Sequence, residues 1–108
     1  MTHVNEITDA TFHESIQAKE FSLVDVYASW CGSCRMFAPH FDEVAGKNPD
    51  IGFLKIDGEK NPEFCDLVPI DNLPFVAVFH HGKFVGGQST NKKEALEEIV
   101  GMIRGRAQ

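Results

Sequence analysis

Cysteine is scarce in this sequence, with three residues in a chain of 108. So few cysteines do not build the disulfide framework of a small secreted domain, and a lone Cys-x-x-Cys pair does not complete a four-cysteine zinc site. The chain is long enough to bury a core without disulfide staples, and a hydrophobic content of 43% supports that core. We therefore predict a single domain over residues 1–108 and no bound metal.

Long apolar runs and basic clusters are also missing. No stretch approaches the length of a transmembrane helix, and the first twenty residues lack the apolar segment of a signal peptide. The formal net charge of −6 disfavours nucleic acid and anionic membranes as partners. We expect a cytoplasmic monomer in a reducing compartment.

Two of the three cysteines, Cys31 and Cys34, are separated by two residues. Residues three apart share one face of a helix, so these thiols can close a small disulfide if a helix begins there. An apolar stretch over 21–28 predicts a buried strand, and the spacing of later apolar residues predicts a helix over 32–47. At such a junction the helix dipole favours a thiolate. The pattern indicates a reversible dithiol, with the Cys31 sulfur open to solvent and Cys34 shielded one turn inside.

The rest of the chain alternates between strand and helix patterns. We expect a weak strand over 3–7, a helix from an N-cap at Thr8-Asp9 to about residue 19, a strand over 51–57, a short helix over 63–68, strands over 75–79 and 83–87, and a last helix after an N-cap at Asn91. A turn at His81-Gly82 makes the last two strands a hairpin. This order predicts an α/β domain with a mixed sheet and helices on both faces.

The segment from Val24 to Pro39 resembles the active-site segment of thioredoxins. The shared features are the upstream Asp25, the motif Trp-Cys-Gly-x-Cys and the proline within the following helix. Leu73-Pro74 and then the turn at 81–83 follow in the order that this family uses, so the resemblance covers nearly the whole chain. It implies the thioredoxin fold, a central mixed β-sheet of four to five strands flanked by helices on both faces. It also implies a thiol-disulfide oxidoreductase that reduces protein disulfides.

The roles implied for single residues follow from this resemblance. Cys31 attacks the substrate disulfide, Cys34 resolves the mixed disulfide, and Asp25 accepts or supplies the proton of the resolving thiol. Pro74 is expected in the cis form, with the backbone of Leu73 pairing with an extended substrate segment. The residues expected to bind substrate are Trp30, Gly32, Ser33, Leu73, Pro74 and Gly87. No cofactor is required, because a thioredoxin-reductase-like donor supplies the electrons.

Several side chains have a second interpretation. Asp25 is either a buried acid, whose pKa burial raises, or a strand-end acid that reaches solvent. The basic partner that this acid often has in the family is replaced by Phe53, with Lys55 two positions on and on the same face. Trp30 is either a core residue or an exposed flap, and Arg35 either favours the thiolate or is simply solvated. Cys65 is either a small apolar residue or a reactive thiol.

The sequence departs from the family in the active-site pair and near the end of the sheet. Ser33 stands where typical thioredoxins carry proline, which predicts a somewhat less reducing couple. Phe75 stands where a small polar residue is common after Pro74, and Gly86-Gly87 and the loop over 89–91 also differ. Two other functions therefore stay open: a disulfide oxidase or isomerase, and a redox-gated binding module that uses the same groove.

Overall fold

The computed structural model describes residues 3–106, which form five strands and four helices. In chain order the elements are β1 (Asn5–Glu6), α1 (Phe12–Ser15), β2 (Phe21–Tyr27), α2 (Gly32–Lys47), β3 (Gly52–Asp57), α3 (Pro62–Cys65), β4 (Phe75–His80), β5 (Lys83–Ser89) and α4 (Lys93–Arg106). Within these residues no helix combines the length and the apolar composition that spanning a bilayer requires.

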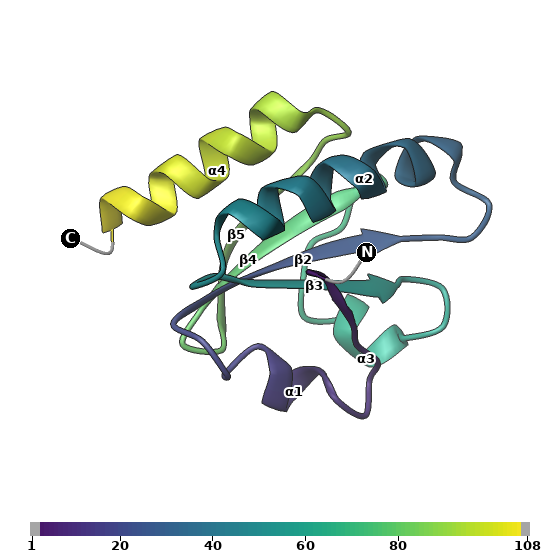
Figure 1. The fold of residues 1–108 in the computed structure, drawn as a ribbon. Coiled ribbons are helices and arrows are strands. Elements are labelled where there is room, and N and C mark those ends of the chain that lie inside the picture. The colour runs from purple at the N-terminus through teal and green to yellow at the C-terminus, as the bar shows by residue number, and fades with distance from the viewer. Residues whose placement is uncertain (1–2, 107–108) are drawn as a thin grey trace.

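The strands form one mixed sheet in the order β1-β3-β2-β4-β5. The central strand β2 is parallel to β3 and antiparallel to β4, and β4 and β5 form the predicted hairpin. Helices α2 and α4 cover one face of this sheet, and α1 and α3 lie on the other (Figure 1). The predicted fold is therefore confirmed, with five strands in the sheet.

The alternation of side chains along β2 divides the interior into two cores. Phe21 and Leu23 point into the core beneath α2 and α4, whereas Val24 and Val26 point into the core shared with α1 and α3. By the same alternation the side chain of Asp25 falls on the α2 face. The sheet thus places an acid beneath the helix that follows the cysteines.

The first helix is shorter than predicted and begins differently. It covers only Phe12–Ser15, and the expected N-cap residue Asp9 serves another helix. The carboxylate of Asp9 accepts hydrogen bonds from the backbone N–H groups of Glu63 (3.1 Å) and Phe64 (2.9 Å), at the start of α3. This acceptor role depends on a contact across more than fifty residues, which local sequence patterns do not reveal.

Other boundaries also differ from the prediction. Helix α3 ends at Cys65, three residues before its predicted end, and Leu67 beyond it is 50% exposed, although Phe64 and Val68 are buried. Strand β5 runs to Ser89, two residues beyond its predicted end. Helix α4 begins at Lys93, beyond the N-cap expected at Asn91, and buries one apolar face made of Leu96, Ile99, Val100 and Ile103.

The two adjacent glycines in β5 have different surroundings. A Cβ atom on Gly87 would lie 2.6 Å from ring carbons of Phe75 and 3.0 Å from the carbonyl oxygen of Val76, whereas a Cβ atom on Gly86 would meet nothing within 4 Å. Phe75 itself is only 3% exposed. Gly87 therefore makes room for the aromatic ring that distinguishes this chain after Pro74.

This difference predicts unequal effects of the same substitution. Gly87→Ala should lower the free energy of unfolding by about 1–3 kcal/mol, because the added methyl group displaces the buried Phe75 ring. Gly86→Ala, the matched control, should change it by less than about 1 kcal/mol or stabilise the fold, since the methyl group has space. Urea unfolding measures both, and equal effects would show that the contact with Phe75 does not require glycine.

Candidate active site

The site is built around a disulfide between Cys31 and Cys34, whose Cα atoms are 5.3 Å apart. Cys31 is the N-cap residue of α2, with extended backbone angles, and Cys34 lies in the first turn. The backbone N–H of Cys34 donates to the sulfur of Cys31 at 3.2 Å. One of the free amides of the helix N-terminus thus points at the sulfur of Cys31, where a negative charge is favoured.

Both cysteines are covered in the disulfide form. Cys34 is 3% exposed, as predicted, but Cys31 is only 6% exposed, so the expectation that its sulfur is open to solvent is wrong for this form. The cysteines pack with Ala28, Tyr27 and Leu73, which explains the burial. Cys31 does line an open groove, through which a partner can approach it.

Ser33 contacts the sulfur of Cys31. Its hydroxyl oxygen lies 3.4 Å from the sulfur. A disulfide sulfur carries no proton, so the Ser33 hydroxyl is the donor. Proline at this position would supply no donor, so the departure from the family adds a polar contact to Cys31.

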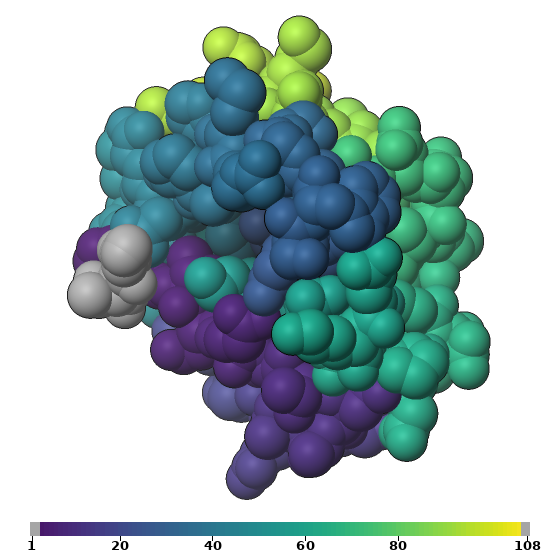
Figure 2. Space-filling view, turned by 90° about the vertical axis from the view of Figure 1, so that its right-hand side faces the viewer, coloured from purple at the N-terminus to yellow at the C-terminus, as the bar shows by residue number. Residues whose placement is uncertain are grey.

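The groove beside the disulfide has a volume of about 470 Å³ and is lined by Trp30, Cys31, Gly32, Ser33, Ile70, Asp71, Asn72 and Leu73. Trp30 is 66% exposed, and its indole N–H donates to the carboxylate of Glu59 at 2.6 Å. This settles the two interpretations of Trp30 in favour of an exposed flap. Figure 2 shows this end of the molecule, where the blue segment after β2 lies beside the teal segment that follows β3.

Leu73, just before β4, lines the groove, and Pro74 lines a neighbouring hollow together with Ser33 and Leu73. The peptide bond between Leu73 and Pro74 is cis, as the resemblance implies, and Pro74 is buried. The backbone N–H of Leu73 is held by the side-chain oxygen of Asn72 at 2.9 Å, so a substrate strand would have to replace that bond.

Gly87 does not join the other predicted substrate-binding residues. It lies within β5, opposite Ala77 of β4. The residues that follow, 89–91, line a hollow with Ser33, Leu73 and Pro74 instead. The backbone N–H of Thr90 also donates to the carbonyl of Pro74 at 3.1 Å, so the end of β5 is the part that borders the site. The cause is the longer strand, which shifts the loop by two residues.

Asp25 is buried beneath α2, with 3% of its surface exposed. Its strand neighbours are Lys55 on β3 and Val76 on β4. Burial raises the pKa of the Asp25 carboxyl from 3.8 to about 7, although the nearby Lys55 ammonium lowers it and Glu6 raises it further. One of its two oxygens has no hydrogen-bond partner among residues 3–106. The interpretation as a solvent-exposed acid is therefore wrong.

A pocket of about 260 Å³ connects Asp25 with Cys34 and the surface. Its other lining residues include Lys55 and Arg35, and its volume is sufficient for several water molecules. Arg35 points its guanidinium at the carbonyl of Ser29, at 3.0 Å. The pocket thus places Asp25, Cys34 and two basic side chains around one opening to the surface.

Lys55 is the basic residue beside Asp25 in the sheet. The sequence alone left open whether Asp25 has such a neighbour. Parallel pairing of β2 with β3 puts the two residues in register, whereas Phe53 packs in the core beneath α2. Lys55 also lies 3.8 Å from Glu6, and Glu6 accepts a hydrogen bond from the Tyr27 hydroxyl. The sequence gives no signal for this position of Glu6, because the two-residue strand β1 is too short for its pattern to fix the register.

Cys65 resembles a small core residue more than a reactive thiol. It is partly buried, and its thiol donates to the carbonyl of Gly58 at 3.2 Å. Burial raises the pKa of the Cys65 thiol, with the nearby carboxylates of Asp9, Asp66 and Asp57 adding to the effect. A raised pKa leaves little thiolate for reaction at neutral pH.

The burial of Asp25 predicts a pH-dependent stability. A pKa of about 7 in the folded chain, against 3.8 as its usual value, corresponds to a loss of roughly 4 kcal/mol when the carboxyl ionises. Between these two pH values the folded chain keeps the proton that the unfolded chain releases, so stability falls as pH rises. Asp25→Asn has no proton to lose. The free energy of unfolding of this variant, relative to that of wild type, should therefore increase from about pH 4 to 7. Above pH 7 the difference should stay constant.

Urea unfolding of both oxidised proteins from pH 4 to 8 measures this difference. Lys55→Met serves as a second variant, because removing the ammonium should move the window to higher pH. A difference between Asp25→Asn and wild type that does not change with pH would contradict the assignment of a protonated, buried Asp25.

Comparison with known proteins agrees with this geometry. The thioredoxin family model matches residues 3–103. The chain is 33% identical over 105 residues to putative thioredoxin 2 of Streptomyces coelicolor, covering 96% of this chain and 78% of that protein. It is 36% identical over 100 residues to the thioredoxin of Staphylococcus saprophyticus, covering 88% of this chain and 92% of that protein.

A solved structure supports the same assignment. A chain in the crystal structure of the complex of ferredoxin:thioredoxin reductase and thioredoxin f2 superposes with a TM-score of 0.87, at 27% identity and with 94% of each chain covered. Fold, sequence and the disulfide at the start of α2 therefore agree: the chain belongs to the thioredoxin family and is a thiol-disulfide oxidoreductase that reduces protein disulfides.

Proposed function

We propose that Cys31 is the attacking thiol and Cys34 the resolving thiol. In the reduced protein, the Cys31 thiolate attacks one sulfur of a substrate disulfide and releases the other as a thiolate. The Cys34 thiolate then attacks the Cys31 sulfur and releases the second substrate thiolate. Two electrons pass to the substrate, and the Cys31–Cys34 disulfide forms. The observation that carries this assignment is the position of the Cys31 sulfur at the N-cap of α2, where the Cys34 amide donates to it.

Asp25 is proposed as the base that prepares Cys34 for its attack. A group with a pKa of about 7 exchanges protons readily at neutral pH. The shared pocket with Cys34 supports transfer through water, and the oxygen of Asp25 without a protein partner is available for a water molecule. Lys55 limits the rise of the Asp25 pKa, since its ammonium favours the ionised carboxylate.

The substrate is proposed to be an extended protein segment lying in the groove beside Cys31. Trp30 offers an exposed aromatic surface for apolar contact, and Gly32 leaves open space beside the sulfur because a Cβ atom there would meet nothing within 4 Å. Leu73 offers its backbone for strand-like pairing, next to Pro74. In place of Gly87, we assign the third border of this groove to residues 89–91.

The electron donor is proposed to be a thioredoxin-reductase-like enzyme, and the compartment to be the cytoplasm. A chain of similar structure occurs in a complex containing ferredoxin:thioredoxin reductase, so this fold can present its dithiol to a reductase. The free thiol of Cys65 is compatible with a reducing compartment. We propose a monomer as the working form.

Variants of the three cysteines test this mechanism. With dithiothreitol as the electron source, wild type should reduce a model protein disulfide over many turnovers, and Cys31→Ser should not. Cys34→Ser, reduced beforehand and freed of dithiothreitol, should accumulate a covalent mixed disulfide with the substrate, visible by mass spectrometry, because attack proceeds without resolution. Cys65→Ser is the matched control and should keep wild-type turnover.

The same experiment separates the remaining alternatives. Accumulation of the adduct by Cys31→Ser instead of Cys34→Ser would reverse the two roles. Partner capture without covalent linkage, retained by both variants and without turnover by wild type, would support a redox-gated binding module.

Ser33 should make the couple less reducing. Its hydroxyl donates to the Cys31 sulfur, and a thiolate accepts a hydrogen bond more strongly than a disulfide sulfur does. The contact therefore stabilises the reduced form. Ser33→Ala should make the reduction potential more negative by about 30 mV, equal to a tenfold change in the equilibrium constant.

Equilibration with defined glutathione ratios measures this potential. Ser33→Thr, which keeps a hydroxyl, should stay close to wild type. Equal potentials for wild type and Ser33→Ala would exclude the hydroxyl as the cause. A wild-type potential in the range of periplasmic oxidants would favour the oxidase or isomerase alternative.

A further inference from the structure

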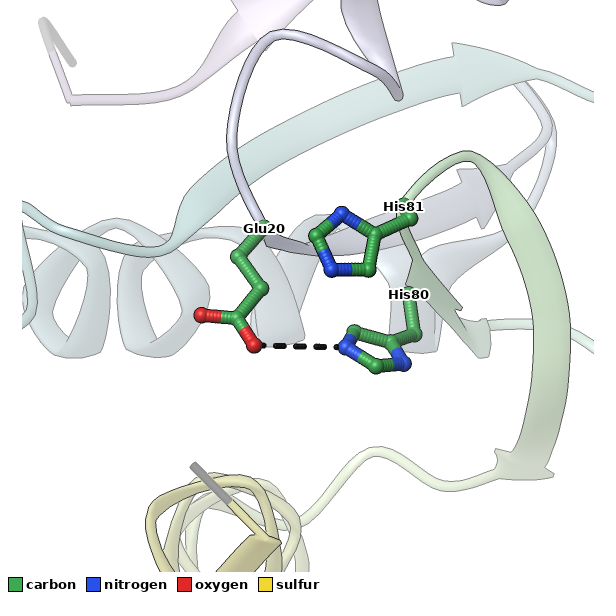
Figure 3. Close-up of side chains that lie close together, drawn as sticks. All are labelled: Glu20, His80 and His81. Carbon is green, nitrogen blue, oxygen red and sulfur yellow. Dashed lines mark hydrogen bonds and ion pairs between the residues drawn. The ribbon is translucent and has the colours of Figure 1, made fainter. Parts of the chain in front are cut away.

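A second cluster of chemically active side chains lies far from the disulfide. It consists of Glu20, His80 and His81, whose ligand atoms all lie within 4.8 Å of one another. Figure 3 shows the two imidazole rings and the carboxylate gathered at one turn. Glu20 directly precedes β2, whereas Cys31 follows its other end. The cluster and the disulfide therefore lie at opposite ends of the central strand.

The backbone holds the three residues together. Phe21 pairs with His80 across β2 and β4, which sets Glu20 beside the end of β4. The N–H of His81 donates to the carbonyl of Glu20 at 2.8 Å. In the turn, His81 and Gly82 have φ angles of 51° and 81°, the positive values of a tight hairpin turn. This turn places the centroids of the His80 and His81 imidazole rings 4.4 Å apart.

The side chains already have part of the geometry of a metal site. The carboxylate of Glu20 lies 3.3 Å from Nε2 of His80. Two ligands on a tetrahedral zinc ion, with bonds of about 2.0–2.1 Å, lie about 3.3 Å apart. The ring of His80 also stacks on Phe21, with the centroids 4.3 Å apart and the planes 13° apart, which limits its rotation.

The donor set selects the class of ion. Imidazole nitrogen suits zinc, copper and nickel, whereas calcium and magnesium prefer an all-oxygen shell. Two histidines with one carboxylate are a known protein ligand set for zinc, and they leave a fourth position for water. All three side chains are at least partly exposed, so an ion can enter without rearrangement of the core.

We propose that Glu20, His80 and His81 bind a divalent transition-metal ion of the zinc class. Residues 20 and 80 are sixty positions apart, so the spacing of histidines along the chain does not predict this site. The bound ion cross-links the start of β2 to the turn between β4 and β5. Because only the folded chain brings the three ligands together, binding stabilises the fold.

Zinc titration of the oxidised protein tests the proposal. The probe is Zn²⁺ alone, added to untagged chain in the Cys65→Ser background, so that the disulfide and the serine leave no thiol to compete for the ion. Isothermal titration calorimetry should show one zinc per chain. Saturating Zn²⁺ should raise Tm by several degrees, and Mg²⁺ at the same concentration should not.

Three variants locate the site, each chosen to preserve the fold. Glu20→Gln keeps the size of the side chain, His80→Phe keeps the stacking on Phe21, and His81→Asn tolerates the positive φ. Each should weaken zinc binding roughly tenfold or more. The matched control is His40→Ala, which removes an exposed histidine from α2 and should bind zinc as wild type does.

Circular dichroism and Tm without metal confirm that each variant is folded. Histidine side-chain NMR signals add a direct readout, since those of His80 and His81 should shift on titration and those of His40 should not. Absence of binding by the wild-type site at millimolar Zn²⁺ would overturn the proposal. So would binding that the folded His80→Phe and His81→Asn variants retain at full strength.

Discussion

The structure depends on where β2 ends relative to α2. Strand β2 lies at the centre of the sheet and is covered on both faces, so its side chains alternate strictly between two cores. The chain leaves the strand, turns at Cys31 and returns over one face as α2. This single crossover places the first turn of α2 above Asp25. The disulfide and Asp25 are therefore brought together by one strand-to-helix connection, and the remaining elements complete the two cores that hold it.

Burying Asp25 costs stability, and the same burial suits the residue to the proton transfer proposed for it. A carboxyl with a pKa near 4 would be ionised throughout the neutral range and could not carry a proton there. In the α2 core its pKa is about 7, and Lys55 in register on β3 keeps the ionised form accessible. Glu6 on the edge strand β1 lies beside Lys55 and accepts a hydrogen bond from Tyr27 at the end of β2. The short strand β1 thus contributes to the site through electrostatics, although it contributes little to the sheet itself.

Sequence patterns within a single segment predicted the part of the site that this segment forms. The bounds of α2, Gly32 to Lys47, were predictable because the cysteines, the apolar spacing and Asn48-Pro49 all lie within one segment. Contacts between distant segments were not predictable from such signals. Asp9 caps α3, Lys55 lies in register with Asp25, and residues 89–91 rather than Gly87 line the hollow beside Leu73 and Pro74. Each of these depends on strand register or strand length, which hydrophobic patterns fix only to within one or two residues.

The replacement of proline by Ser33 has two distinct effects on the redox couple of Cys31 and Cys34. Proline is tolerated in the first turn of a helix because its missing N–H has no intrahelical partner there, so serine gains no backbone hydrogen bond within α2. What serine adds is a hydroxyl within reach of the Cys31 sulfur. Serine also removes the backbone rigidity of proline. Proline would have restricted the unfolded or reduced chain to fewer conformations, including those that close the disulfide. Because the reduced backbone has greater conformational freedom, closing the disulfide costs more entropy. In addition, the Ser33 hydroxyl stabilises the Cys31 thiolate of the reduced form. Both effects favour the reduced form, so they add in the direction of a less reducing couple.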